Sequence, residues 1–205
     1  MARRGTALEL AVLGLLHEAP MHGYELRKRL NIVLGWGRLL SYGTLYPCLK
    51  GLTRRGHIVA DNDPDPAVRG RRARIVYQLT ADGKEHFETM LQDAGPSTWD
   101  DENFDVRFAF FGRVAAPTRV RILEGRRSRL EERLENVRAA THARRERVDS
   151  YTLELQRHGL ESVEREINWL TDLIERERAA TADTGEADPG PTATNSHQSH
   201  EQKDK

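Results

Sequence analysis

The apolar pattern of the first ninety residues changes from helical spacing to alternation and back, and this order constrains the fold more than any other feature. Apolar residues recur every three or four positions in three successive stretches, after which β-branched residues alternate with polar ones. The predicted elements are helices over residues 6–19, 21–34 and 41–55, strands over 57–60 and 73–79, and a fourth helix over 84–91.

The predicted third helix has one clearly apolar face. Its apolar residues recur at spacings of four and three: Leu45, Leu49 and Leu52. Pro47 fits best in the first turn of a helix, so either Thr44 caps the helix or the helix begins at Ser41 and bends. A helix pair followed by a two-stranded ribbon is typical of a winged helix-turn-helix, whose second paired helix enters the major groove of DNA.

The second half of the chain predicts long amphipathic helices. We expect one helix over residues 118–158, ended by Gly159, and another over 160–178. Two copies of each would bury their apolar seams in a bundle, so the sequence predicts a homodimer. The residues expected at its interface are Leu123, Leu130, Leu134, Val137, Val148, Leu155, Leu160, Val163, Ile167, Leu170 and Ile174.

The predicted fold class is therefore mostly α: a winged helix-turn-helix of three helices and a two-stranded β-wing, followed by a long-helix dimerisation domain. We expect the DNA-binding domain over residues 1–93, a linker and aromatic-rich segment over 94–116, and the dimerisation domain over 117–180. Residues 181–205 lack an apolar period and are rich in small, polar and charged residues, which predicts a disordered tail.

The aromatic-rich segment has two interpretations. Five aromatic residues lie within thirteen positions, from Trp99 to Phe111. They either pack the long helices onto the first domain or line a pocket for a small planar or hydrophobic effector. The residues expected to line such a pocket are Trp99, Phe104, Phe108 and Phe111.

The charge distribution favours an anionic partner for the first domain. The whole chain has a formal net charge of +0, but residues 1–79 hold 13 Lys+Arg against 6 Asp+Glu, a net charge of +7.

The single cysteine, Cys48, excludes an intramolecular disulfide and suits a reducing cytoplasm; its thiol either packs in the core or senses oxidants. The apolar run 8–16 is too short to span a membrane and includes Glu9.

Enzyme and metal chemistry lack a sequence signal. The chain contains no glycine-rich phosphate loop after a strand and no nucleophile elbow. Its eight histidines do not pair on a helix face with cysteine or carboxylate companions. We therefore expect no catalytic residues, no metal and no cofactor.

Three motifs in a fixed order resemble the PadR family of bacterial transcriptional regulators. They are HGYEL at residues 22–26, SYGTLYPCLKGL at 41–52 and YQLTADG at 77–83. The family often has Leu-Glu after the last leucine of the second motif, where this chain has Thr53-Arg54. The resemblance covers about residues 7–91, and the remainder resembles the family's C-terminal dimerisation domain in shape only.

The resemblance implies a cytoplasmic homodimer that binds an inverted-repeat operator in double-stranded DNA, acts as a repressor and is released by a small-molecule effector. The residues that we expect to contact DNA are Ser41, Tyr42, Thr44, Tyr46 and Lys50 on the third helix, and Arg71, Arg72 and Arg74 beside the wing. The alternative is a helical protein-interaction module whose winged helix binds protein instead of DNA.

Overall fold

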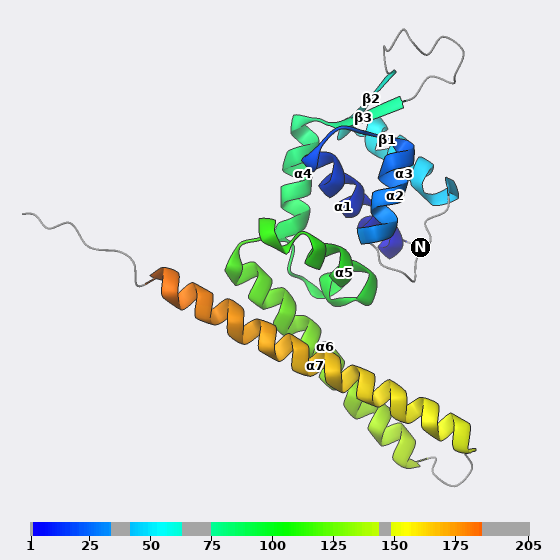
Figure 1. Cartoon of the computed structure of the whole chain (residues 1–205), viewed down its shortest axis with the longest axis vertical. Coiled ribbons are helices and arrows are strands. Elements are labelled where there is room, and N and C mark those ends of the chain that lie inside the picture. Colours follow the sequence, from blue (N-terminus) through cyan, green and yellow to red (C-terminus); the bar gives the residue numbers. More distant parts are fainter. Residues whose placement is uncertain (1, 34–41, 63–74, 144–148, 186–205) are drawn as a thin grey trace, which may run out of the picture.

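The computed structural model describes residues 2–33, 42–62, 75–143 and 149–185. Its first half is a winged helix, which lies at the top of Figure 1. The mostly α fold class and the winged helix are confirmed. The elements of this domain are α1 (Ala2–Glu18), β1 (Met21–His22), α2 (Gly23–Val33), α3 (Tyr42–Arg54), β2 (Ile58–Asn62), β3 (Ile75–Leu79) and α4 (Ala81–Gln92).

Helix α1 forms the centre of the winged-helix core. It contacts α2, α3, α4 and α5, so almost every side of the helix is covered by another element. Ala11, Val12 and Leu13 are consecutive and fully buried, as only a helix packed on all sides allows. The apolar run at residues 8–16 is therefore a core helix, as the sequence predicted.

The sheet has three strands rather than the two expected. Its order is β1-β3-β2 and both pairs are antiparallel, so Tyr77 in the central strand lies opposite Met21 on one side and Ala60 on the other. The sequence predicted that the second helix begins at Met21, which is wrong. Pro20 interrupts the helical pattern, Met21 and His22 pair with β3, and α2 begins only at Gly23.

Helix termini in this domain follow the local sequence. Gly56 has a φ of 77°, the left-handed conformation that glycine favours, and it lies two residues after Arg54, the last residue of α3. Thr80 caps α4, because its hydroxyl oxygen accepts a hydrogen bond from the Gly83 amide at 3.0 Å. With this cap α4 begins at Ala81, three residues earlier than the apolar pattern alone predicted.

The second half of the chain is a long helical hairpin attached through a short aromatic segment. Figure 1 shows α6 and α7 side by side, extending away from the winged helix, with α5 between them and the domain. Ion pairs Arg119–Glu177 and Arg126–Glu166 show that the two helices are antiparallel. The elements are η2 (Pro96–Trp99), α5 (Asp101–Ala109), η3 (Phe111–Arg113), α6 (Ala116–Ala143) and α7 (Ser150–Gly185).

The predicted single helix over residues 118–158 is wrong. The chain instead forms α6 and α7, and α7 runs through Gly159, which was expected to end a helix. A glycine in a helix interior costs only about 1 kcal/mol, which the packing of α7 on α6 offsets. Helix α7 also continues to Gly185, into the segment predicted to be a disordered tail, and residues 186–205 lie outside the described part of the chain.

Candidate nucleic-acid interface

Helix α3 separates an apolar face from a polar one. Leu45, Leu49 and Leu52 are at most 1% exposed, which confirms the predicted core face. Thr44, Tyr46 and Lys50 are exposed on the remaining surface of the helix. Helix α3 begins at Tyr42 and contains Pro47 in its interior, so Thr44 lies inside the helix and is not its N-terminal cap.

Some of the predicted contact residues cannot be placed. Tyr42 begins α3, but the position of its side chain is outside what the structure describes. Ser41, Arg71, Arg72 and Arg74 also lie outside the described residues. For these five residues, a contact with DNA stays a prediction.

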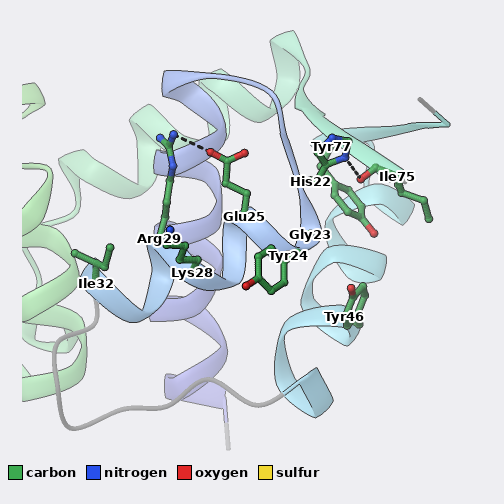
Figure 2. Close-up of a pocket in the computed structure, with 10 residues that line it drawn as sticks. All are labelled: His22, Gly23, Tyr24, Glu25, Lys28, Arg29, Ile32, Tyr46, Ile75 and Tyr77. Carbon is green, nitrogen blue, oxygen red and sulfur yellow. Dashed lines mark hydrogen bonds and ion pairs between the residues drawn. The ribbon is translucent and has the colours of Figure 1, made fainter. Parts of the chain in front are cut away.

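A cleft of about 920 Å³ opens beside α3, between α2 and strand β3. Figure 2 shows the rings of Tyr24 and Tyr46 projecting into it from α2 and α3. Gly23 allows this close approach, since a Cβ atom there would lie 3.3 Å from the Tyr46 hydroxyl oxygen. The cleft thus joins the surfaces of the two paired helices.

Tyr24 lies on the exposed side of α2. Its side chain is 70% exposed, whereas Leu26 and Leu30 are fully buried. A spacing of two residues turns a helix by about 200°, which puts Tyr24 opposite Leu26. Beside it, Lys28 also lines the cleft, and Arg29 donates a hydrogen bond to Glu25 at 2.8 Å.

Cys48 lies on the partly buried side of α3. Burial, with the carboxylate of Glu9 as a second cause, raises the pKa of its thiol to about 11. A thiol with this pKa is almost entirely protonated at neutral pH and is a poor nucleophile. This favours packing over oxidant sensing at Cys48.

The aromatic segment makes both a packed cluster and a hollow. The rings of Phe104, Phe108 and Trp169 pack with centroid separations of 5.2–6.4 Å and line a hollow of about 500 Å³ between α5, α6 and α7. Trp169 comes from α7, outside the aromatic-rich segment that was expected to line a pocket. Trp99 and Phe111 are not among the residues that line this hollow, and the Trp99 ring covers Gly125.

A buried arginine forms the polar wall of the same hollow. The Arg126 guanidinium donates hydrogen bonds to Glu166, Asp101 and the Trp99 carbonyl, and it lies 5.3 Å from the centroid of the Phe104 ring. Burial lowers the pKa of Arg126, but the hydrogen bonds to both carboxylates outweigh it, so that the net pKa is raised. Arg126 therefore stays charged and ties η2, α5 and α7 to α6.

The comparison of sequences decides the family of the first domain. Residues 12–89 match the transcriptional regulator PadR-like family, a stretch that runs from within α1 to near the end of α4 and includes all of α3. The winged-helix domain belongs to the PadR-like family. Members of this family are transcriptional regulators rather than enzymes. No curated protein matches the sequence.

The chain is also similar to solved structures of other regulators. The putative transcriptional regulator TA0346 from Thermoplasma acidophilum is 30% identical over 39% of this chain and 72% of that chain, with a TM-score of 0.34. Bacillus subtilis PadR in complex with operator DNA is 21% identical over 83% of this chain and 98% of that chain, with a TM-score of 0.39. The same protein in complex with p-coumaric acid is 21% identical over 84% and 99%, with a TM-score of 0.37.

Outside the PadR-like domain, most residues predicted at a dimer interface are buried within the single chain. The fully buried ones are Leu123, Leu130, Leu134, Leu170 and Ile174, and the half-buried ones are Leu160, Val163 and Ile167. Val137 and Leu155 are exposed, and Val148 lies outside the described residues. The exposed apolar surface of the hairpin is thus concentrated near the start of α7, where Tyr151 is 86% and Leu155 70% exposed.

Among the helices that the structure describes, none combines the length and apolar character of a bilayer-spanning segment.

Proposed function

We propose that this chain is a sequence-specific DNA-binding transcriptional regulator and that α3 is its reading helix. The observation that carries the proposal is the polar, solvent-exposed face of α3 inside a PadR-like domain. The major groove of B-DNA is wide enough for an α-helix. Helix α3 is held by its buried leucines, so its exposed side is free to enter the groove.

The chemistry of the exposed residues suits this assignment. Lys50 supplies a positive charge for a phosphate or for the acceptor edge of guanine, and Thr44 and Tyr46 supply hydroxyl groups for phosphate oxygens. Tyr24 and Lys28 extend the same surface onto α2 across the cleft of Figure 2. The wing arginines Arg71, Arg72 and Arg74 would add contacts to the neighbouring backbone or minor groove.

A matched pair of lysine variants tests the proposal. Lys50→Ala and Lys84→Ala each remove one positive charge from the same domain, but Lys84 is exposed on α4 rather than on α3. We expect Lys50→Ala to weaken binding to the DNA upstream of its own gene by about tenfold or more. It should also reduce the slope of log K against log salt by about 1. Lys84→Ala should bind like the unchanged protein.

The titration is run by fluorescence anisotropy at two salt concentrations with random competitor DNA. Equal DNA affinities for the two variants would mean that the exposed face of α3 around Lys50 does not contact DNA. Binding of the unchanged protein that disappears with competitor would contradict sequence-specific recognition of that fragment and would favour a winged helix that binds protein.

We also propose that the chain acts as a homodimer on an inverted-repeat operator. The leucines buried between α6 and α7 cannot contact a second copy without opening the hairpin, so we assign the contact to exposed apolar residues such as Tyr151 and Leu155. A dimer would present two copies of α3 about 34 Å apart, the spacing of successive major grooves on one face of DNA. As a chromosome-binding repressor it would work in the bacterial cytoplasm.

The hollow between α5, α6 and α7 is our candidate effector site. Phe104, Phe108 and Trp169 offer aromatic faces to a small planar or hydrophobic ligand, and Arg133 at the rim offers a donor to a polar end. Such a ligand would release DNA only if it bound the DNA-free conformation more tightly. A screen for compounds that lower the anisotropy of the bound operator, repeated with Phe108→Ala, tests this assignment.

A further inference from the structure

A cluster of metal-ligand side chains lies in the winged helix, on the side of α1 that faces the end of α3. Glu9 comes from α1, His57 follows the turn that ends α3, and His86 comes from α4. One ligand atom from each residue lies within 4.8 Å of the other two. We propose that Glu9, His57 and His86 form a binding site for a divalent transition-metal ion, with Zn²⁺ as its probe.

The geometry of the three side chains already approaches that of a metal site. The His86 Nε2 and Glu9 Oε1 atoms are 2.9 Å apart, and the His57 and His86 rings are 4.2 Å apart between centroids. The His57 Nδ1 atom is buried and has no hydrogen-bond partner among the described residues. A buried nitrogen without a partner is unfavourable, and coordination to an ion is one way to satisfy it.

The donor set indicates the class of ion. Two imidazole nitrogens and one carboxylate oxygen are ligands of three-residue zinc sites, in which a water occupies the fourth position. Imidazole also suits copper, nickel and iron, whereas magnesium and calcium prefer oxygen alone. In a tetrahedral site with bonds of about 2.0 Å the ligand atoms lie about 3.3 Å apart, so the three atoms, now within 4.8 Å of one another, would draw closer around an ion.

The backbone around His57 holds this ligand in place. Its carbonyl oxygen accepts hydrogen bonds from the Thr80 amide at 3.1 Å and from the Thr80 hydroxyl at 2.9 Å, and its own amide donates to the Leu52 carbonyl at 3.0 Å. The first turn of α4 approaches His57 so closely that a Cβ atom at Gly83 would lie 1.9 Å from the His57 carbonyl oxygen. Two of the three ligands thus come from segments that are fixed relative to each other.

A neighbouring cation competes with the ion. The Arg55 guanidinium lies 2.7 Å from Glu9 Oε2, and it is about half exposed. Its positive charge repels a metal ion and holds the carboxylate that the ion needs. Removing Arg55 should therefore strengthen metal binding, whereas removing a ligand should weaken it. A purely structural network of ion pairs would not give these opposite effects.

Zinc binding to the untagged full chain is measured by competition with a chromophoric chelator, and Co²⁺ absorption reports the ligand geometry. The variants are His57→Asn, His86→Ala and Arg55→Ala. The double variant His197→Ala/His200→Ala is the control for the histidines of the C-terminal segment. Circular dichroism confirms that each variant folds.

We expect one Zn²⁺ per chain in the unchanged protein and in the double-histidine control. Either ligand substitution should weaken binding at least 100-fold, since loss of an outer partner alone costs 10–100-fold. Arg55→Ala should bind more tightly than the unchanged chain. The proposal is overturned if no stoichiometric ion binds, if His86→Ala retains full affinity, or if binding disappears in the double-histidine control.

A bound ion would join the end of α3 to α1 and α4 and would raise the melting temperature with ion concentration. Any effect of the ion on DNA affinity rests on the proposed function. The binding measurement uses protein alone, so its failure would leave the DNA assignment of α3 unchanged.

Discussion

The hairpin should depend strongly on one buried arginine, which can be tested with Arg126→Met. The Arg126 side chain is only 6% exposed, and methionine retains its apolar stem while removing all donors to Glu166, Asp101 and the Trp99 carbonyl. Removing one partner of a buried ion pair costs about 3–5 kcal/mol. Because Glu166 is 33% exposed and Asp101 62% exposed, both can recover some hydration, so we expect the lower limit, about 3 kcal/mol.

The assay is urea unfolding followed by circular dichroism. With a slope of about 2.5 kcal/mol/M, a loss of about 3 kcal/mol lowers the unfolding midpoint by about 1.2 M. The control is Arg138→Met on the same helix. Arg138 pairs with Glu164 where the two side chains are 53% and 43% exposed, so its loss should cost less than about 1 kcal/mol. Equal midpoints for the two variants would refute the assignment of Arg126 as the main polar tie of the hairpin.

Four other outcomes follow from features of single residues. Gly83→Ala should destabilise the chain by more than about 2 kcal/mol in thermal unfolding, because its Cβ atom would meet the His57 carbonyl oxygen. Gly159→Ala should instead stabilise it by about 0.5–1 kcal/mol, since α7 has open space there; a lower melting temperature would contradict this. Alkylation of Cys48 by iodoacetamide should be slow at pH 7 and rise about tenfold per pH unit towards a pKa of about 11, whereas a rate that levels off below pH 9 would rule out the raised pKa. Leu155→Asp should weaken self-association in sedimentation experiments without changing the monomer's helix content; an unchanged dimer would exclude this part of α7 from the interface.

Local signals in the sequence were sufficient where a residue's role depends on its neighbours along the chain. The leucines of α3 at spacings of four and three predicted its buried face, and the predicted end at residue 55 lies one residue beyond the observed end at Arg54. Helix α4 was predicted as well, although it begins three residues earlier than expected. The PadR-like motifs lie in this same part of the chain, which explains why the family could be identified from sequence.

Features that depend on distant parts of the chain were not predictable in the same way. A heptad pattern of apolar residues looks the same in the sequence whether those residues pack against a helix of the same chain or of a second chain. The pattern therefore did not distinguish the hairpin of α6 and α7 from one long helix. Strand β1 is too short to show a period and forms because β3 offers a free edge to Met21 and His22. Glu9, His57 and His86 lie on three separate elements, and no spacing rule connects them.

The hairpin of α6 and α7 is attached to the winged helix at one end only, so a rotation at that end moves the other end over a long distance. The Phe110 ring of the aromatic segment packs against Gly14 of α1, so the base of the hairpin is anchored in the same core as the winged helix. Helix α6 has 28 residues and is about 42 Å long at 1.5 Å per residue. A rotation of about 5° at that base would move the far end by about 4 Å, roughly two-thirds of the 5.4 Å pitch of a helix. Small changes in side-chain packing around α5 are therefore amplified into displacements large enough to change which surfaces meet at the other end.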